Sequence, residues 1–409
     1  MREMKDSGVP WIGEIPKNWE ISQLKRWVKV NNGKEISEEV NQGDLSAIPV
    51  YGSGGPFKYT NSSMYKGEAV LFGRKGTLGK PLYVDDEFWV VDTMYYLTMM
   101  SLNPKFCYYL LTAFDWIPFI TKTAIPSIVA SDIVAQKYPI PSKEEQLRIA
   151  DFLDTKCAEI DSFLEKTKAS IEEYKKLKQS VITDAVTKSI RGERPMKDSG
   201  VEWIGEIPTE WKTSRVGLHF EIILGKMLCS EPLGADYTLE KYYCAANVHF
   251  SGVDKCDLKT MWFSSSEKEA YLVKEGDLLV VEGGAGAGGS AIVKDQSERI
   301  YIQNSIMIVR PKAQSSAVYL RYLLESLVSR GYVDFACNKA TIPHFTKDKL
   351  GQVPFLLPEE AEQQEIAAYL DEKCAAIDSL IASKEALITE LETYKKSIIY
   401  EYVTGKKEV

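Results

Sequence analysis

The stretch MKDSGVPWIGEIPKNW at Met4–Trp19 returns as MKDSGVEWIGEIPTEW at Met196–Trp211. Of the 16 positions, 13 are identical, and the offset between the two copies is 192 residues. Self-similarity at a long, fixed period is typical of an internally repeated architecture. The chain is therefore predicted to consist of two related halves, each of which opens with this segment.

A second pair of similar segments closes the two halves. PSKEEQLRIADFLDTKCAEIDSF, which starts at Pro141, reappears as PEEAEQQEIAAYLDEKCAAIDSL from Pro358, now at an offset of 217 residues. The shared openings and endings enclose two middles that barely align. The sequence thus predicts six segments: an opening (1–19), a first middle domain, domain 1 (20–141), a helical region (142–195), a second opening (196–211), a second middle domain, domain 2 (212–357) and a second helical region (358–409).

Short strand-like runs and turn residues mark both middles as mostly β. GEAVLFGRKGTLGKPLYV in the first and GDLLVVEGGAGAGGSAIVKD in the second each predict a strand, a glycine-rich turn and a second strand. A few helices are expected among the strands, at Pro104–Phe114 and Ala317–Arg330. The fold class is therefore predicted to be α+β.

The endings carry a coiled-coil pattern. Apolar positions recur alternately four and three residues apart from Leu153 to Val181, and the equivalent positions recur from Leu370 to Ile398. A helix over 154–188 would be on the order of 50 Å long at 1.5 Å per residue. Since the two apolar series occupy equivalent positions of the repeat, each helix can pack against the other through the same residues. The two helices are therefore expected to pair antiparallel and to relate the halves by a pseudo-two-fold axis. Packing of each helix against its own domain is the alternative.

Composition limits the compartment and the chemistry. The polar N-terminus and the absence of a long apolar run predict a cytoplasmic protein that does not span a membrane. Seven scattered cysteines and three histidines show no ligand-like spacing, so no metal site is expected. The net charge of −8 is concentrated in residues 358–409, with 12 acidic and 6 basic side chains, while residues 20–140 are balanced at 12 and 12. The acidic end suits protein contacts better than DNA, whereas a balanced domain can still gather its cations on one face.

Taken together, these segments resemble the specificity subunit of type I restriction–modification enzymes. The resemblance rests on the repeated opening, the Pro-x-x-x-Glu-Gln starts at Pro141 and Pro358, the Ile-Asp pairs at Ile160 and Ile377, and the Val-Thr helix ends at Val186 and Val403. It covers essentially the whole chain. It implies two target-recognition domains separated by two helical regions that form an antiparallel coiled coil.

The resemblance also implies a function and partners. A subunit of this family is not itself catalytic: it recognises a two-part site on double-stranded DNA and brings two methyltransferase subunits there, and restriction subunits can join. It binds no cofactor, and its partners use S-adenosylmethionine, ATP and Mg²⁺ to methylate adenine at N6 or to restrict. A methyltransferase's own Asn/Asp-Pro-Pro-aromatic motif is absent from this chain, as is a Walker-type GxxxxGK[ST] motif.

Polar and glycine-rich turns in the two middles supply the candidate DNA-binding residues. Glycines let backbone amides approach a phosphate, and basic or hydroxyl side chains can reach phosphates or base edges. The candidates in domain 1 are Lys34, Ser53, Lys58, Tyr59, Arg74, Lys75, Thr123 and Ser127. The candidates in domain 2 are Lys226, Gly284, Gly286, Lys339, Thr341 and His344. A solvated surface turn is the alternative for each of them.

Two other classes of function compete with DNA recognition. A protein–protein scaffold could carry two β-rich modules on a coiled coil without any DNA. GGAGAGG at Gly283–Gly289 also contains a literal GxGxxG, which would indicate a nucleotide-binding enzyme if a helix followed it. The residues after it, Ser290–Lys294, predict a strand instead.

Overall fold

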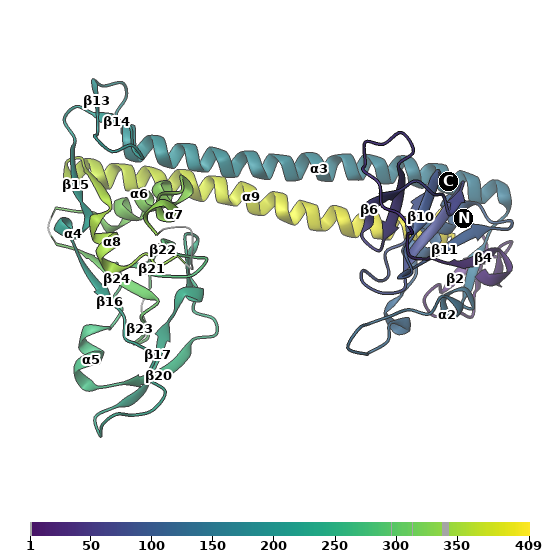
Figure 1. The fold of residues 1–409 in the computed structure, drawn as a ribbon, viewed down its shortest axis with the longest axis horizontal. Coiled ribbons are helices and arrows are strands. Elements are labelled where there is room, and N and C mark those ends of the chain that lie inside the picture. Colours follow the sequence, from purple (N-terminus) through teal and green to yellow (C-terminus); the bar gives the residue numbers. More distant parts are fainter. Residues whose placement is uncertain (1, 296, 313, 338–342) are drawn as a thin grey trace. The chain divides into compact units, whose positions relative to one another are not determined.

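The computed structural model describes residues 2–295, 297–312, 314–337 and 343–409 (Figure 1). It divides into two compact units, one of Met1–Lys168 with Lys384–Val409 and the other of Ala169–Ser383. The long helices α3 (Lys143–Lys188) and α9 (Glu360–Val403) each run through both units. Each unit therefore combines one β-rich domain with a piece of both helices. The six segment limits expected from the sequence stay predictions.

Unit 1 is built on two four-stranded sheets and two short ones. The larger sheets have the orders β4-β11-β8-β9 and β6-β5-β10-β7, and the short sheets pair β1 with β2 and β3 with β12. The helices outside the long pair are α1 (Pro104–Ala113) and α2 (Ala130–Val134). The strands are β1 Met4–Asp6, β2 Glu14–Pro16, β3 Glu20–Gln23, β4 Val28–Asn32, β5 Ile48–Gly52, β6 Gly55–Thr60, β7 Tyr65–Lys66, β8 Ala69–Gly73, β9 Leu82–Val84, β10 Glu87–Val90, β11 Met94–Met99 and β12 Lys137–Ile140.

The described residues of unit 2 form a four-stranded sheet, a three-stranded sheet and three two-stranded pairs. Their orders are β16-β24-β21-β22, β20-β17-β23, β13-β14, β15-β25 and β18-β19. The shorter helices are α4 Val216–His219, α5 Ser265–Ala270, α6 Ala317–Ser329, α7 Tyr332–Ala336 and α8 Lys347–Gln352. The strands are β13 Met196–Asp198, β14 Glu206–Pro208, β15 Lys212–Arg215, β16 Phe220–Leu224, β17 Thr238–Tyr243, β18 Val248–His249, β19 Gly252–Val253, β20 Lys259–Phe263, β21 Leu278–Val281, β22 Ser290–Ile292, β23 Tyr301–Ile302, β24 Ile306–Pro311 and β25 Pro354–Leu357.

The two middles share one topology although their sequences barely align. In unit 1, β11 pairs with β4 and β8, and β8 pairs with β9, all antiparallel. The same three antiparallel pairings recur in unit 2 between β24, β16, β21 and β22. Each unit also contains a parallel pair, β5 with β10 in unit 1 and β17 with β23 in unit 2. Both predicted hairpins and both predicted helices are thereby confirmed, as is the α+β class.

Contacts between α3 and α9 are antiparallel in both units. In unit 1, the rings of Phe152 and Tyr402 lie 4.4 Å apart, and Lys395 pairs with Asp161 at 2.6 Å, so residue numbers rise along one helix as they fall along the other. In unit 2, Lys178 pairs with Asp378 at 2.7 Å. Asp378 is the repeat of Asp161, and Lys395 is the repeat of Lys178, both at the offset of 217. The same ion pair is thus made twice with the two repeats exchanged, as a pseudo-two-fold relation requires.

The predicted seam forms the contact between the helices. In unit 1, α3 contributes Leu153, Cys157, Ile160 and Leu164 to the same core cluster as Ile398 of α9. In unit 2, Leu370 and Cys374 of α9 belong to the cluster against which Val181 of α3 packs. The described part of the chain contains no helix that combines the length and the apolar character needed to cross a membrane.

Each repeated opening is fastened to the start of its long helix. Trp19 and Trp211 are each only 1% exposed. The indole Nε1 of Trp19 donates to Glu145 Oε2 at 3.0 Å, and that of Trp211 donates to Glu362 Oε2 at 3.3 Å. An arginine two residues before each repeated stretch, Arg2 before Met4 or Arg194 before Met196, pairs with the same carboxylate. The duplicated opening and the glutamate of each Pro-x-x-x-Glu-Gln start are therefore parts of one intrachain scaffold.

Candidate nucleic-acid interface

The glycine-rich turn of domain 1 lies beside the loop that ends the domain. The backbones of Lys75 and Ser127 form a β-bridge, and the amide of Ile128 donates to the carbonyl of Arg74 at 3.0 Å. Ser53 supports the turn from the other side, because its Oγ accepts from the amide of Thr77 at 2.9 Å. We call residues 73–79 and 121–128 turn–loop cluster 1.

Hydroxyl groups fix the loop of cluster 1 internally. Thr121 Oγ1 lies 3.1 Å from Thr123 Oγ1 and 3.1 Å from Ser127 Oγ, and it accepts from the amide of Ser127 at 2.9 Å. Thr123 Oγ1 also donates to the carbonyl of Ile125 at 2.8 Å. A loop tied in this way is preorganised, which reduces the ordering cost of binding a ligand. The structure thus brings together Ser53, Arg74, Lys75, Thr123 and Ser127, all of which are sequence-derived candidates.

Cluster 1 and the adjoining Lys80 present positive charge on the surface. The segments 73–84 and 116–131 contain no acidic residue, and the side chains of Arg74, Lys75, Lys80 and Lys122 are exposed. Within the described ranges, none of these four cations forms an ion pair with a carboxylate. Cations free of carboxylate partners are available to phosphates, which dominate protein–DNA affinity. Sequence reasoning missed Lys80 and Lys122, although Lys122 lies next to the candidate Thr123.

The remaining candidates of domain 1 lie outside cluster 1. Lys58 and Tyr59 are on β6, where Lys58 pairs with Glu39 at 2.7 Å and Tyr59 is half-buried. Lys34 follows β4 and is exposed, and its carbonyl accepts from the indole of Trp89 at 2.7 Å. Lys58 is therefore already neutralised by a carboxylate, whereas Lys34 remains a free surface cation in the described part of the domain.

Domain 2 repeats the turn–loop arrangement with different side chains. Gly283 and His344 form a β-bridge. The amide of Gly284 donates to the carbonyl of Pro343 at 3.1 Å, and the amide of Phe345 donates to the carbonyl of Glu282 at 2.6 Å. His344 is exposed, and its Nδ1 lies 3.3 Å from Glu282 Oε2. Residues 282–289 and 343–345 form turn–loop cluster 2. Lys339 and Thr341 fall outside the described residues.

The glycines of cluster 2 serve different purposes. Gly288 has φ +82°, and a Cβ there would lie 2.8 Å from a methyl of Val333, so packing requires glycine. A Cβ on Gly286 would meet only one methyl of Val281, at 3.9 Å. Gly284 has φ +86° and open space around it. The amide of Gly284 is already bonded to Pro343, whereas Gly286 is exposed and leaves room for a ligand to approach its backbone. The turn leads into the strand β22, as predicted, and not into the helix that a dinucleotide site needs.

Lys226 does not lie on the surface. Its side chain is only 8% exposed, its ammonium pairs with Glu267, and it lies 4.8 Å from the centre of the Tyr237 ring. Its backbone matches that of Lys34, since the amide of Lys226 donates to Ile302 and that of Lys34 donates to Val90. The two lysines thus occupy the similar entries expected from the sequence, but burial and the glutamate give Lys226 a structural role in place of a direct DNA contact.

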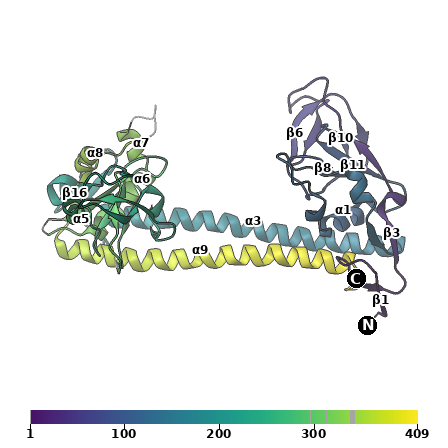
Figure 2. The same ribbon diagram turned by 90° about the horizontal axis from the view of Figure 1, so that it is seen from below.

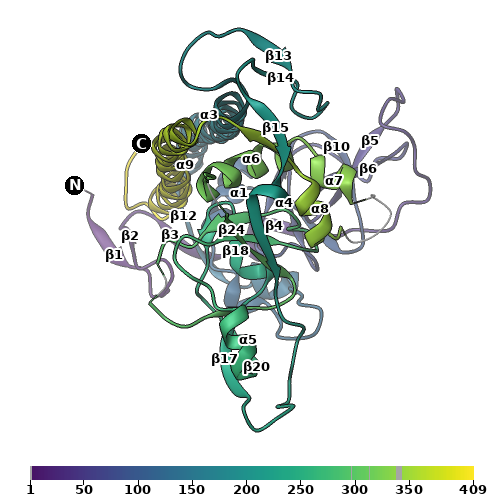
Figure 3. The same cartoon turned by 90° about the vertical axis from the view of Figure 1, so that its left-hand side faces the viewer.

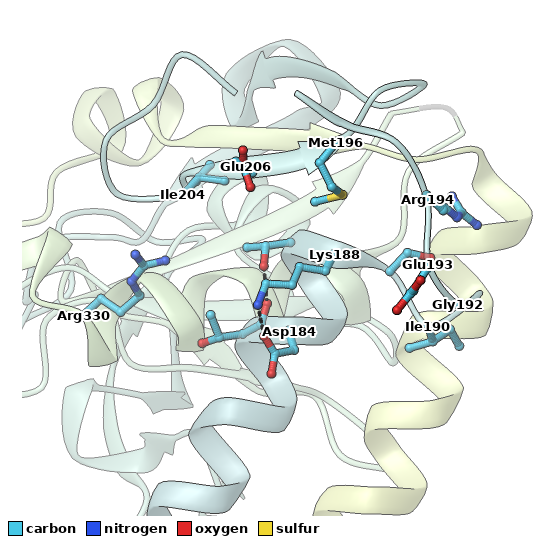
Figure 4. A pocket seen from close by; sticks show the side chains of 13 residues that line it. Asp184, Lys188, Ile190, Gly192, Glu193, Arg194, Met196, Ile204, Glu206 and Arg330 are labelled. Carbon is cyan, nitrogen blue, oxygen red and sulfur yellow. Dashed lines mark hydrogen bonds and ion pairs between the residues drawn. The ribbon is translucent and has the colours of Figure 1, made fainter. Parts of the chain in front are cut away.

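A pair of equivalent cavities lies where each opening meets a long-helix end. The cavity in unit 2 has a volume of about 920 Å³, and its walls include Lys188, Arg194, Met196 and Glu206 (Figure 4). A cavity of about 590 Å³ in unit 1 is lined by the repeats of those residues, Gly405, Arg2, Met4 and Glu14. Lys188 pairs with Asp184 at 2.8 Å on the wall of the first cavity. Each half of the chain therefore has a cavity at this place with four equivalent wall positions, while the size and the other wall residues differ.

Known proteins share both the sequence pattern and the fold. A model of the type I restriction modification DNA specificity domain matches residues 16–173 and 208–393. The chain is 24% identical over 432 residues to the type I restriction enzyme MjaVIII specificity subunit of Methanocaldococcus jannaschii, which covers 97% of this chain and 94% of that protein. It is 21% identical to the type I restriction enzyme EcoDI specificity subunit of Escherichia coli, with 96% and 90% covered.

Solved structures agree in fold at low sequence identity. A chain solved in work on complex assembly and conformational transition of the type I R-M system superposes with a TM-score of 0.69 at 16% identity, over 96% of this chain and 99% of that chain. The HsdS subunit from Thermoanaerobacter tengcongensis gives a TM-score of 0.51 at 17% identity, over 96% and 98%. Since the family model matches both halves and most of the length, the chain belongs to the type I restriction modification DNA specificity domain family, and its role is DNA sequence recognition in a restriction–modification complex.

Proposed function

We propose that each recognition domain reads one half of a two-part DNA site and that the paired helices set the gap between the halves. The observation that carries this proposal is the turn–loop cluster, which occurs once in each domain at the same place in the same topology but with different side chains. Two domains that share a topology but differ in the side chains of their clusters suit a DNA target with two unlike halves. The exchanged ion pairs of α3 and α9 support a pseudo-two-fold frame, which matches two half-sites on a duplex.

The partners and cofactors follow from the same proposal. The chain is non-catalytic and cytoplasmic, and it brings two methyltransferase subunits to the site, with restriction subunits as further members of the complex. S-adenosylmethionine, ATP and Mg²⁺ belong to those partners, and this chain holds none of them. The equivalent cavities, one per half, support a partner that binds in two copies. The candidates Arg74, Lys75, Thr123, Ser127, Gly284, Gly286 and His344 face the DNA in this proposal.

Selection from random DNA duplexes tests the proposal. The chain, purified together with its methyltransferase subunits, is expected to enrich two short sequences separated by a constant gap. An Arg74→Ala, Lys75→Ala double variant should weaken enrichment of one half only, and Lys66→Ala is the matched control. If the wild-type complex enriched no sequence, or a single undivided one, the two domains would not be readers, and a protein–protein scaffold would explain the fold better.

A further inference from the structure

One helix in each domain keeps the same contacts to the long helices although the surrounding sequences have diverged. These helices are α1 in unit 1 and α6 in unit 2, and Figures 2 and 3 show them beside α3 and α9 respectively. Both contain the short run Tyr-Leu-Leu, at Tyr109–Leu111 and Tyr322–Leu324. The rest of the two helices differs in sequence and in length, so the retained features mark what the position requires.

The first retained contact is a hydrogen bond from tyrosine to aspartate. Tyr109 Oη donates to Asp154 Oδ1 at 2.7 Å, and Tyr322 Oη donates to Asp371 Oδ1 at 2.7 Å. The two aspartates are equivalent positions of α3 and α9, at the offset of 217. Burial, together with the carboxylate partner, raises the pKa of both phenols above the usual tyrosine value, so both stay protonated and donate.

The second retained contact joins a glutamine to the N-cap of the same helix. Gln146 Oε1 accepts from the amide of Asn103 at 2.8 Å, and Gln363 Oε1 accepts from the amide of Ser316 at 2.9 Å. Asn103 and Ser316 are the N-caps of α1 and α6. Both glutamines are buried, and each also donates to a proline carbonyl at the start of its own long helix, at 3.0 and 3.1 Å.

The spacing between the two contacts is identical in both units. N-cap and tyrosine are six residues apart in each short helix, which is about 9 Å along the axis. Glutamine and aspartate are eight residues apart in each long helix, about 12 Å along the axis. A single contact would let the domain pivot, whereas two contacts at this separation fix the angle of the short helix against the long one.

We propose that Gln146 with Asp154, and Gln363 with Asp371, are positioning residues that hold each recognition domain at a fixed angle to the helix pair and so sharpen the choice of gap length. This inference rests on the proposed function. The two units differ in their additional contacts. In unit 1, Lys105 also pairs with Asp154, and in unit 2, Tyr319 Oη donates to the carbonyl of Val186 at 3.3 Å and Thr183 Oγ1 lies 2.9 Å from Ser326 Oγ. Each domain therefore has a further contact to the long helices beside that of its tyrosine.

Removing the tyrosine hydroxyl from the tyrosine–aspartate contact of each unit tests the inference with little risk to folding. Tyr109→Phe and Tyr322→Phe are made in the full chain within the methyltransferase complex, and affinity is measured for duplexes with the best gap and with gaps one base pair shorter and longer. We expect the ratio of affinity at the best gap to affinity at the other gaps to fall about threefold or more, because a hydrogen bond to a charged group is lost. The half-site sequences should not change.

Controls separate positioning from stability. Tyr138→Phe removes a buried hydroxyl that donates within domain 1, to the carbonyl of Ile133 at 3.2 Å, and should leave the ratio unchanged. Asp371→Asn keeps an acceptor and should retain more gap discrimination than Asp371→Ala. Equal loss of affinity at all gaps, or no change at any gap, would overturn the inference and leave two-part recognition intact. Failure of the wild-type complex to bind a two-part site would instead overturn the proposed function.

Discussion

Replacing Arg74 and Lys75 together by alanine tests most directly whether cluster 1 contacts DNA phosphates. Both side chains are exposed on a turn that lacks acidic neighbours in sequence, and the turn is held by Ser53 and by the bridge to Ser127. Alanine at both positions should therefore remove charge without disturbing the turn. If each cation neutralises one phosphate, the slope of log K against log salt concentration should become shallower by about 0.9 per cation, or roughly 1.8 in all.

That change in slope is large enough to measure. Between 50 and 200 mM salt, the wild-type affinity should fall about 12-fold more than the affinity of the double variant, since fourfold more salt acts on a slope difference of roughly 1.8. Fluorescence anisotropy on a labelled duplex across a salt series gives both slopes. Lys66→Ala is the matched control in the same domain, because Lys66 is exposed but pairs with Glu87 at 2.7 Å.

Two outcomes would refute the reasoning in different ways. An unchanged slope in the double variant, with the control also unchanged, would show that these cations do not meet phosphates. A loss confined to one base position at an unchanged slope would place Arg74 at a guanine edge, where arginine binds through two hydrogen bonds. Lys58→Ala should lie near the control, because Glu39 already neutralises Lys58.

Three further predictions concern other parts of the chain. Gly286→Ala should leave the melting temperature within about a degree of wild type, because its Cβ would meet only one methyl at 3.9 Å. The same variant should still weaken DNA binding, because the added methyl crowds the approach to cluster 2. DNA binding equal to that of wild type would argue against a close approach of the backbone to DNA. Glu362→Ala should lower the free energy of unfolding of unit 2 by roughly 3–5 kcal/mol in a urea titration, because Trp211 and Arg194 lose a buried partner, and a smaller loss than 1 kcal/mol would contradict the scaffold role. Burial raises the pKa of Glu325 despite Arg321 at 3.0 Å, so the contribution of Glu325 to stability should fall as pH rises above about 4.3, and melts should show that Glu325→Gln gains stability relative to wild type between pH 4 and pH 7.

Much of the scaffold formed by the openings and the long helices could be predicted, because its sequence occurs twice in the chain. The repeat, the seam spacing and the two glycine-rich hairpins each follow from periodicity or turn chemistry within a short window. The strand-like residues after Gly289 were enough to predict that no helix follows the GxGxxG. Antiparallel pairing followed from the equivalence of the two seams, and the exchanged ion pairs of Asp161 and Asp378 bear it out.

The side chains of the candidate site were harder to predict, because their surroundings come from distant parts of the chain. Lys226 looks like a surface cation in sequence, but Glu267, 41 residues later, pairs with it under the surface. The contact between Tyr109 and Asp154 likewise joins residues 45 positions apart. Only the Tyr-Leu-Leu run shared by α1 and α6 could have pointed to it.

Changing the length of both long helices tests the central proposal most directly. One heptad inserted in α3 after Lys168 and one in α9 after Ser383 keeps the seam in register and lengthens each helix by about 10 Å, the rise of about three base pairs. Selection from random duplexes should then recover the original half-site sequences with an altered gap. Recovery of both half-sites at the original gap would contradict the proposal that the helices set the distance.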